Sequence, residues 1–220
     1  MRVGLFGGSF NPAHDGHAHV AETALMRLDL DRVLWLVSPQ NPLKSSRETA
    51  PLSARMDSAR RMARGPSMIV SDAETRIDAR YTLDTLRVLK GRFPGVRFVW
   101  IMGSDNLASF HRWRGWVEIA RLVPIAVVAR PGAMLQSRAA PAARRFAHAR
   151  VSSRQAPLLP YMAAPAWVYL RGRLNFASST ALRARLTREP LDRAALAAEP
   201  PAPAGRQPAI VLVSPPKIDR

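Results

Sequence analysis

Short apolar runs alternate with helix-like stretches along this chain, and that alternation constrains its fold more than any other feature. Five runs have the length and composition of strands buried on both faces, at residues 2–6, 33–37, 68–70, 96–102 and 124–128. Helical spacing occupies the intervals, as at 82–93, where Leu83, Leu86 and Leu89 recur on one face. Strand alternating with helix predicts a parallel sheet with right-handed crossovers, so we expect an α/β, Rossmann-like, doubly wound fold.

The pattern loosens after residue 130 and changes character near the end of the chain. An Ala/Arg-rich helix candidate at 135–150 is followed by a strand-like run at 166–170 and by a helix that begins at Ser178. Alanine and proline dominate from Pro190 onward. We therefore expect one domain over 1–189 and a partly flexible Ala/Pro-rich tail over 190–220, whose role the sequence leaves open.

Cysteine usage and hydropathy limit the classes of protein to which this chain can belong. The chain has no cysteine, which excludes a disulfide framework and a thiolate metal site. Its apolar stretches are far shorter than a membrane span, so we expect no membrane partner. The cytoplasm is the expected location, and the oligomeric state stays open, with a homo-oligomer among the alternatives.

The net charge of +17 points to polyanions, which include nucleotides as well as nucleic acids. Only Lys44, Lys90 and Lys217 among the 33 basic residues are lysine, and residues 121–188 contain twelve arginines without one Asp or Glu. An RNA-binding module is therefore an alternative of another class. The arginines neither interleave with aromatic residues nor form a known binding motif, so nucleic acid is the less favoured partner.

The first chemical motif, GGSFNPAHDGH, follows directly after the first apolar run. Gly7 and Gly8 allow a tight turn whose backbone N–H groups can approach a phosphate, and the N-terminus of the following helix points its partial positive charge to the same place. His14 and His17 share one face of that helix and can donate hydrogen bonds to a phosphate in a transition state. A plain turn with surface histidines is the alternative, while a zinc site lacks a third ligand.

A second motif, SSTALRARL, opens a late helix with hydroxyl groups and places Arg183 one turn further on. Together the two motifs resemble the nucleotidyltransferase superfamily, with its G-G-x-F-x-P-x-H-x-G-H turn and late S-S-T-x-x-R. The stretches NPLK at 41–44, RYTLDTL at 80–86, IMGSDNL at 101–107 and FHRWRGWVEI at 110–119 resemble bacterial nicotinate-nucleotide adenylyltransferases in the same order. The resemblance covers roughly residues 2–188.

The resemblance implies a three-layer α/β/α nucleotidyltransferase fold and the transfer of AMP from ATP to nicotinate mononucleotide, with Mg²⁺ bound through the ATP phosphates. The products would be nicotinate adenine dinucleotide and pyrophosphate, in NAD biosynthesis. Nicotinamide mononucleotide and phosphopantetheine are alternative acceptors on the same fold. The preference for nicotinate over nicotinamide cannot be read from the residues alone.

The resemblance also implies a role for each matching residue. Catalysis would fall to His14, His17 and Arg183. ATP would be bound by Gly7, Gly8, Ser9, Phe10, Gly103, Asp105, Ser179 and Thr180. Nicotinate mononucleotide would be bound by Lys44, Thr82, Thr85 and Trp113, with the indole stacked on the pyridine ring.

Structural readings of the same residues stay open, and two positions depart from the family pattern. Thr82 could cap its helix, Asp105 could be a turn residue, and Trp113 could pack in the core. Asn11 stands where many superfamily members have Asp. The glycine that the family usually has before this tyrosine is missing at Tyr81. Its absence puts in doubt the backbone hydrogen bonds that would bind the nicotinate carboxylate.

Overall fold

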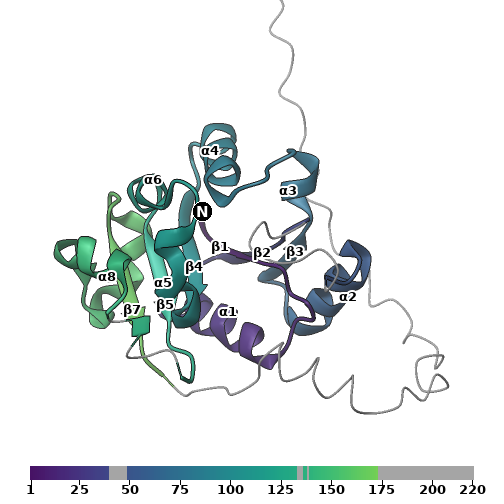
Figure 1. Ribbon diagram of the computed structural model, residues 1–220, viewed down its shortest axis with the longest axis horizontal. Helices are drawn as coiled ribbons and strands as arrows, with labels where there is room; N and C mark the ends of the chain where they lie inside the picture. Colours follow the sequence, from purple (N-terminus) through teal and green to yellow (C-terminus); the bar gives the residue numbers. More distant parts are fainter. Residues whose placement is uncertain (40–48, 133–135, 138, 173–220) are drawn as a thin grey trace, which may run out of the picture.

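A computed structural model describes residues 1–39, 49–132, 136–137 and 139–172. Its centre is a parallel sheet with the strand order β3-β2-β1-β4-β5-β7-β6 (Figure 1). The strands are β1 (Arg2–Gly8), β2 (Arg32–Val37), β3 (Met68–Ser71), β4 (Arg97–Gly103), β5 (Ile125–Val128), β6 (Arg150–Val151) and β7 (Trp167–Leu170). All the neighbouring strands pair in parallel, as the alternation predicted.

Helices connect these strands and cover the sheet on both sides. The α-helices are α1 (Asp15–Arg27), α2 (Leu52–Met62), α3 (Ala73–Arg76), α4 (Thr82–Arg92), α5 (Ser104–Ser109), α6 (Trp116–Leu122) and α8 (Pro141–Arg145). The 3₁₀ helices are η2 (Phe110–Arg112), η3 (Ala147–Ala149) and η4 (Ser153–Tyr161). The three-layer α/β/α arrangement expected from the sequence is confirmed.

Two apolar cores hold the layers together, one on each face of the sheet. Helices α1, α2 and η4 pack on one face around Phe10 and Trp35, and helices α4, α5, α6 and α8 pack on the other around Trp100. Burial of Leu83, Leu86 and Leu89 confirms the helical face predicted for 82–93. Because the strands are covered on both faces, they read as continuous apolar runs rather than alternating ones.

The strand order reverses between β1 and β4, and this position fixes where a ligand binds. β1 pairs with β2 on one side and with β4 on the other, so the connections leaving β1 and β4 diverge at their carboxyl ends. Ligands of open α/β sheets bind in the crevice that opens at such a switch point. Gly8 ends β1 there and Gly103 ends β4, which brings two of the sequence motifs to one edge of the sheet.

The region after β5 differs from its prediction. Within the candidate 135–150, the described residues form the short helix α8, then η3 and the edge strand β6, rather than one long helix. Arg150 pairs with Trp167 of β7, and the indole N–H of Trp167 donates to the Phe146 carbonyl oxygen at 2.7 Å. Sheet pairing takes up only the last residue of the candidate, and Pro141 begins α8 after Ala140, whose ψ of 140° is not helical. The predicted helix at Ser178 and the predicted tail 190–220 lie outside the described residues.

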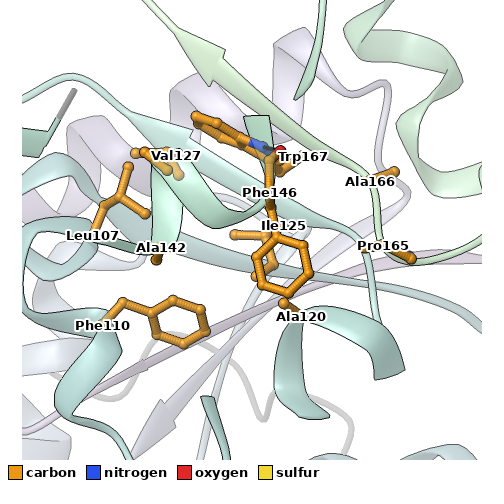
Figure 2. A pocket seen from close by; sticks show the side chains of 11 residues that line it. Leu107, Phe110, Ala120, Ile125, Val127, Ala142, Phe146, Pro165, Ala166 and Trp167 are labelled. Atoms are coloured by element: carbon orange, nitrogen blue, oxygen red, sulfur yellow. Dashed lines mark hydrogen bonds between the residues drawn. The ribbon is translucent and has the colours of Figure 1, made fainter. Parts of the chain in front are cut away.

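An apolar pocket of about 20 Å³ lies between β5, β7, α6 and α8 (Figure 2). Its wall consists of Leu107, Phe110, Ala120, Ile125, Val127, Ala142, Ala143, Phe146, Pro165, Ala166 and Trp167. Figure 2 shows the rings of Phe110 and Phe146 turned toward this space. The lining offers no charged side chain to a phosphate, so the pocket is a packing defect with room for about one water molecule rather than a reaction site. Within the described residues, no helix has the length and apolar character needed to cross a membrane.

Candidate active site

The two glycines that end β1 lie against aromatic rings, so Gly7 has no room for a side chain and Gly8 has little. A Cβ at Gly7 would lie 2.4 Å from Cη2 of Trp100, and one at Gly8 would lie 3.1 Å from Cζ of Phe10. Phe10 itself adopts a positive φ of 45° and turns its ring into the core, where it is 1% exposed. Any contact of Phe10 with ATP would therefore come from its backbone.

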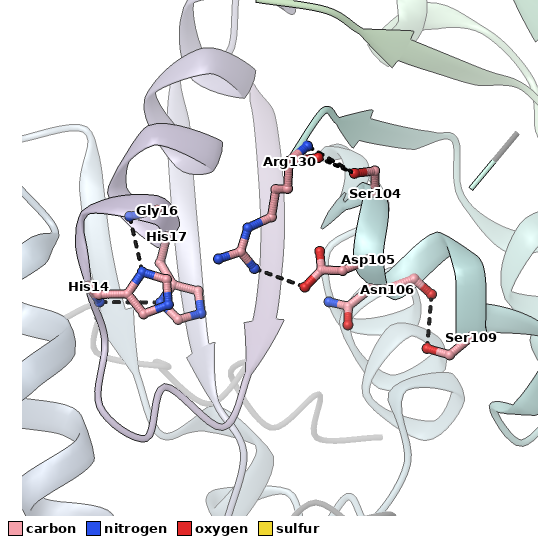
Figure 3. Close-up of polar contacts among 8 residues, drawn as sticks. All are labelled: His14, Gly16, His17, Ser104, Asp105, Asn106, Ser109 and Arg130. Atoms are coloured by element: carbon pink, nitrogen blue, oxygen red, sulfur yellow. Dashed lines mark hydrogen bonds and ion pairs between the residues drawn. The ribbon is translucent and has the colours of Figure 1, made fainter. Parts of the chain in front are cut away.

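His14 and His17 cap the helix α1 with their own rings. The Gly16 N–H donates to Nδ1 of His14 at 3.0 Å, and the His14 N–H donates to Nδ1 of His17 at 3.3 Å. The two ring centroids lie 3.8 Å apart. The imidazoles thus take up two backbone N–H groups at the start of α1, those of His14 and Gly16, which a phosphate could otherwise have bound (Figure 3).

This capping determines the tautomer of each neutral ring. A nitrogen that accepts a hydrogen bond carries no proton, so the proton of each neutral imidazole lies on Nε2. The backbone N–H groups polarise the rings and strengthen Nε2–H as a donor. The helix N-terminus therefore acts on a ligand through two side-chain donors set side by side.

His14 is neutral at physiological pH. Its side chain is 4% exposed, and burial lowers its pKa to about 4, with a further lowering by the charge of Arg130. The nearby Asp15 and Asp105 oppose this effect. A neutral His14 keeps its capping bond and serves as a hydrogen-bond donor rather than as a cation.

Arg130 brings a fixed positive charge to the histidine pair. It lies two residues after β5, and its guanidinium donates to Asp105 at 2.9 Å, at the start of α5. Figure 3 shows the Arg130 side chain between the histidine rings and Asp105. A Cβ at Gly103 would lie 2.3 Å from Oδ1 of Asp105 and 2.6 Å from Cδ of Arg130, so glycine is required for this close approach.

Sequence reasoning singled out Gly103 and Asp105 but missed Arg130, one of twelve arginines in an acid-free stretch. Its position just after a predicted strand was the available signal, because ligands bind at the carboxyl ends of strands. The described residues contain no group of three His, Cys, Asp or Glu side chains that could hold a metal ion.

On the other side of the switch point, α4 carries the residues expected to meet the acceptor. Thr82 is its first residue and is half-buried. Thr85 is fully buried, and its hydroxyl donates to Oε1 of Glu74 at 3.1 Å. The structure therefore places Thr85 behind the surface, where it supports α4 through Glu74 rather than presenting its hydroxyl to solvent.

Glu74 is a second residue that sequence reasoning missed. Burial raises the pKa of its carboxyl group, and hydrogen bonds from Ser38 and Thr85 oppose the rise. Because it comes from the short helix α3 after β3, Glu74 links the end of β2 with the first turn of α4. No local sequence pattern distinguishes it from an exposed helical glutamate.

Trp113 lies on the same side of the molecule and is half-buried. Its ring is edge-on to Phe110 and Trp100, with centroids 5.4 and 6.2 Å apart. Tyr81, just before Thr82, has the guanidinium of Arg114 over its ring at 4.6 Å. A partly exposed indole supported from behind is compatible with both packing and stacking on a planar ring.

The remaining predicted residues lie outside the described part of the chain. These are Lys44, Ser179, Thr180 and Arg183. The structure thus brings together the first motif and the end of β4, and the second motif stays a prediction.

A family model described as cytidylyltransferase-like matches residues 5–185. A relative from Caulobacter sp. (strain K31), named "Probable nicotinate-nucleotide adenylyltransferase", is 70% identical over 188 residues, which are 86% of this chain and 100% of the relative. The chain belongs to the nicotinate-nucleotide adenylyltransferase family. A relative of the same name from Methylorubrum extorquens (strain PA1) is 54% identical over 84% of this chain and 100% of its own length.

The fold agrees with a solved structure of more distant sequence. Plasmodium falciparum nicotinic acid mononucleotide adenylyltransferase complexed with NaAD superposes with a TM-score of 0.65 at 17% identity, over 86% of this chain and 85% of that chain. At that identity the likeness concerns the fold, and the family assignment rests on the curated relatives. As a member of this family the chain is a nucleotidyltransferase.

Proposed function

We propose that this chain joins AMP from ATP to nicotinate mononucleotide, giving nicotinate adenine dinucleotide and pyrophosphate, a step of NAD biosynthesis. The observation that carries the proposal is the histidine pair at the switch point. Its two Nδ1 atoms accept backbone N–H groups, and the charge of Arg130 lies beside them. Family membership supports the choice of the acceptor. The cytoplasm is the proposed place of action, since the chain has no cysteine that would need an oxidising compartment.

The chemistry requires positioning and charge neutralisation rather than a general base. A phosphate oxygen of the mononucleotide attacks the α-phosphorus of ATP in line, the new P–O bond forms, and the bond to the β-phosphate breaks with release of pyrophosphate. The attacking group is already an anion, so no proton has to be removed. The Nε2–H groups of His14 and His17 and the guanidinium of Arg130 would stabilise the charge on the α-phosphate and the leaving group. From outside the described residues, Arg183 would add a further cation.

Mg²⁺ fits this site as a companion of the nucleotide. The carboxylate of Asp105 is engaged by Arg130, so the protein around the histidines offers more donors for phosphate than ligands for a metal. Such a site suits an ion that takes its ligands from phosphates and water. When bound with ATP, Mg²⁺ neutralises phosphate charge. ATP itself would be held by the turn 7–10, by Gly103 and Asp105, and by Ser179 and Thr180.

The acceptor would lie beside α4. Thr82 at the start of α4 and Trp113 are both partly exposed, their neighbours Tyr81 and Arg114 are in contact, and Thr85 supports α4 through Glu74. Lys44 is proposed to meet the phosphate of the mononucleotide. The cation over Tyr81 contributes positive charge next to Thr82, which favours an anionic nicotinate over a neutral nicotinamide.

Pyrophosphate release from ATP tests the proposal, with nicotinate mononucleotide, nicotinamide mononucleotide and 4′-phosphopantetheine as parallel acceptors. Release with nicotinate mononucleotide, at least tenfold above either other acceptor in kcat/KM, is the expected result. Release with another acceptor would retain the reaction and change the substrate. Absence of release from folded protein with all three acceptors would refute the proposal and return RNA binding, measured for its salt dependence, to consideration.

A further inference from the structure

Arg55 of α2 is a buried cation that the proposed reaction does not use. Its side chain is 2% exposed. The acceptors recorded for its guanidinium within the described residues are backbone carbonyl oxygens: Ala50 at 2.9 Å, Ser9 at 2.9 Å, Ser38 at 2.6 Å and Pro39 at 2.8 Å. Burial of an arginine normally requires a paired carboxylate, so this arrangement calls for an explanation.

The four carbonyl groups come from three separate segments. Ser9 belongs to the turn after β1, Ser38 and Pro39 follow β2, and Ala50 precedes α2. The guanidinium of Arg55 is therefore the point at which these segments are joined. All three lie at or next to the carboxyl ends of β1 and β2, at the edge of the sheet that carries the histidines.

A second residue on the same face of α2, Ser58, forms a hydrogen bond with the same turn. Ser58 accepts the Ala13 N–H at 3.1 Å, and its own hydroxyl donates to the Arg55 carbonyl oxygen at 2.9 Å, with the Phe10 carbonyl oxygen further away at 3.4 Å. The two side chains, three residues apart in the helix, thus hold the turn at Ser9 and Ala13. The histidine cap begins at the residue that follows Ala13.

We infer that Arg55 is a positioning residue for nucleotide binding: it fixes the phosphate-binding turn against the end of β2 through its four carbonyl hydrogen bonds. The inference rests on the proposed function. Only the planar fork of an arginine presents donors in several fixed directions, whereas a lysine ammonium is a compact point charge on a flexible stem. Because carbonyl groups satisfy the donors without cancelling the charge, Arg55 also raises the positive potential beneath the turn.

Three variants at α2 test the inference, each assayed at a temperature where circular dichroism shows it folded. Arg55→Lys keeps the charge and loses the fork, and we expect kcat/KM for ATP to fall about 10-fold or more. Ser58→Ala removes the second contact with the turn, and we expect kcat/KM for ATP to decrease about 3-fold or more. Met56→Ala is the matched control, because Met56 is buried in the core from the same helix and takes no part in the hydrogen bonds to the turn described above.

The decisive comparison is between melting temperature and binding. We expect Met56→Ala to lower the melting temperature without changing kcat/KM, and Arg55→Lys to weaken binding of a non-hydrolysable ATP analogue as well as turnover. Unchanged kcat/KM and unchanged analogue affinity in Arg55→Lys would overturn the inference. If Arg55→Lys does not fold, unchanged values in Ser58→Ala would overturn it. Analogue binding to the wild-type chain without turnover on nicotinate mononucleotide would refute the proposed acceptor while leaving the role of Arg55 testable.

Discussion

His14→Asn separates the two tasks that the His14 ring performs. Asparagine is among the best N-cap residues, and its side-chain oxygen can accept the Gly16 N–H that Nδ1 of His14 now accepts. It does not titrate, and it cannot place an N–H where Nε2 of the imidazole lies. The variant should therefore keep the cap, lose the pH dependence contributed by His14, and lose one donor to the phosphate.

The size of the pH effect follows from the pKa. Burial first, and Arg130 second, lower the pKa of His14 from 6.5 to about 4 in the folded chain. Between these pH values the unfolded chain binds more protons than the folded one, so stability is full above pH 6.5 and decreases as the pH falls toward 4. With 1.36 kcal/mol for each pKa unit, the loss attributable to His14 is about 3 kcal/mol at pH 4 and about 2 kcal/mol at pH 5.

Urea unfolding at pH 7, 5 and 4 measures this loss. We expect the free energy of unfolding of the wild-type chain to decrease by about 3 kcal/mol more than that of His14→Asn between pH 7 and 4. Other titrating groups are common to both chains and cancel in the difference. At pH 7 the variant should lower kcat by about 10²- to 10³-fold, as loss of one oxyanion donor does. Parallel pH profiles of stability in the two chains would refute the assignment of a buried, neutral His14.

Three further changes probe the surrounding residues. His17→Ala removes the second Nε2–H donor and should lower kcat by about 10² or more in steady-state assays, while near-normal turnover would contradict the mechanism. Gly103→Ala would place a methyl group 2.3 Å from Oδ1 of Asp105, so the ion pair must shift and kcat/KM for ATP should fall about 10- to 100-fold; an unchanged value would argue against a role for that pair. Glu74→Ala removes the nearer acceptor of the buried Thr85 hydroxyl and leaves it the Tyr81 carbonyl oxygen at 3.4 Å, so it should cost about 1 kcal/mol in urea unfolding, with Glu74→Gln as the milder control.

The strands were predictable because burial on both faces leaves a simple signature. Each of the five predicted runs coincides with a strand, with ends that differ by at most two residues. Helix α4 was also predictable, since Leu83, Leu86 and Leu89 repeat at helical spacing. The prediction of one helix over 135–150 was wrong because alanine and arginine favour helix locally, whereas Pro141 disfavours helix at Ala140 and the pairing of Arg150 with β7 is a tertiary effect that propensity does not contain.

The candidate site, like the fold, was predictable only in part. One continuous segment, from the end of β1 to the first turn of α1, contains Gly7, Gly8, His14 and His17. Their proximity therefore follows from sequence spacing alone. The tautomer of the histidines did not follow, since the sequence does not reveal which backbone N–H groups their rings accept. The burial of Thr85 could not be predicted from the sequence, because its hydrogen-bond partner, Glu74, comes from another helix.

The arginines show why composition alone could not locate the chemistry. Among the arginines that the structure describes, two are central to the argument: Arg130 pairs with Asp105 beside the histidines, and Arg55 joins three segments beneath the turn. Others in the acid-free stretch stack on aromatic rings, as Arg150 does 5.3 Å from the centroid of Trp167. The same side chain is thus an ion-pair partner, a backbone clamp or a packing group, and tertiary contacts decide which. In this strongly basic chain, Arg55 and Arg130 thus bring positive charge to one edge of the sheet, where a triphosphate needs it.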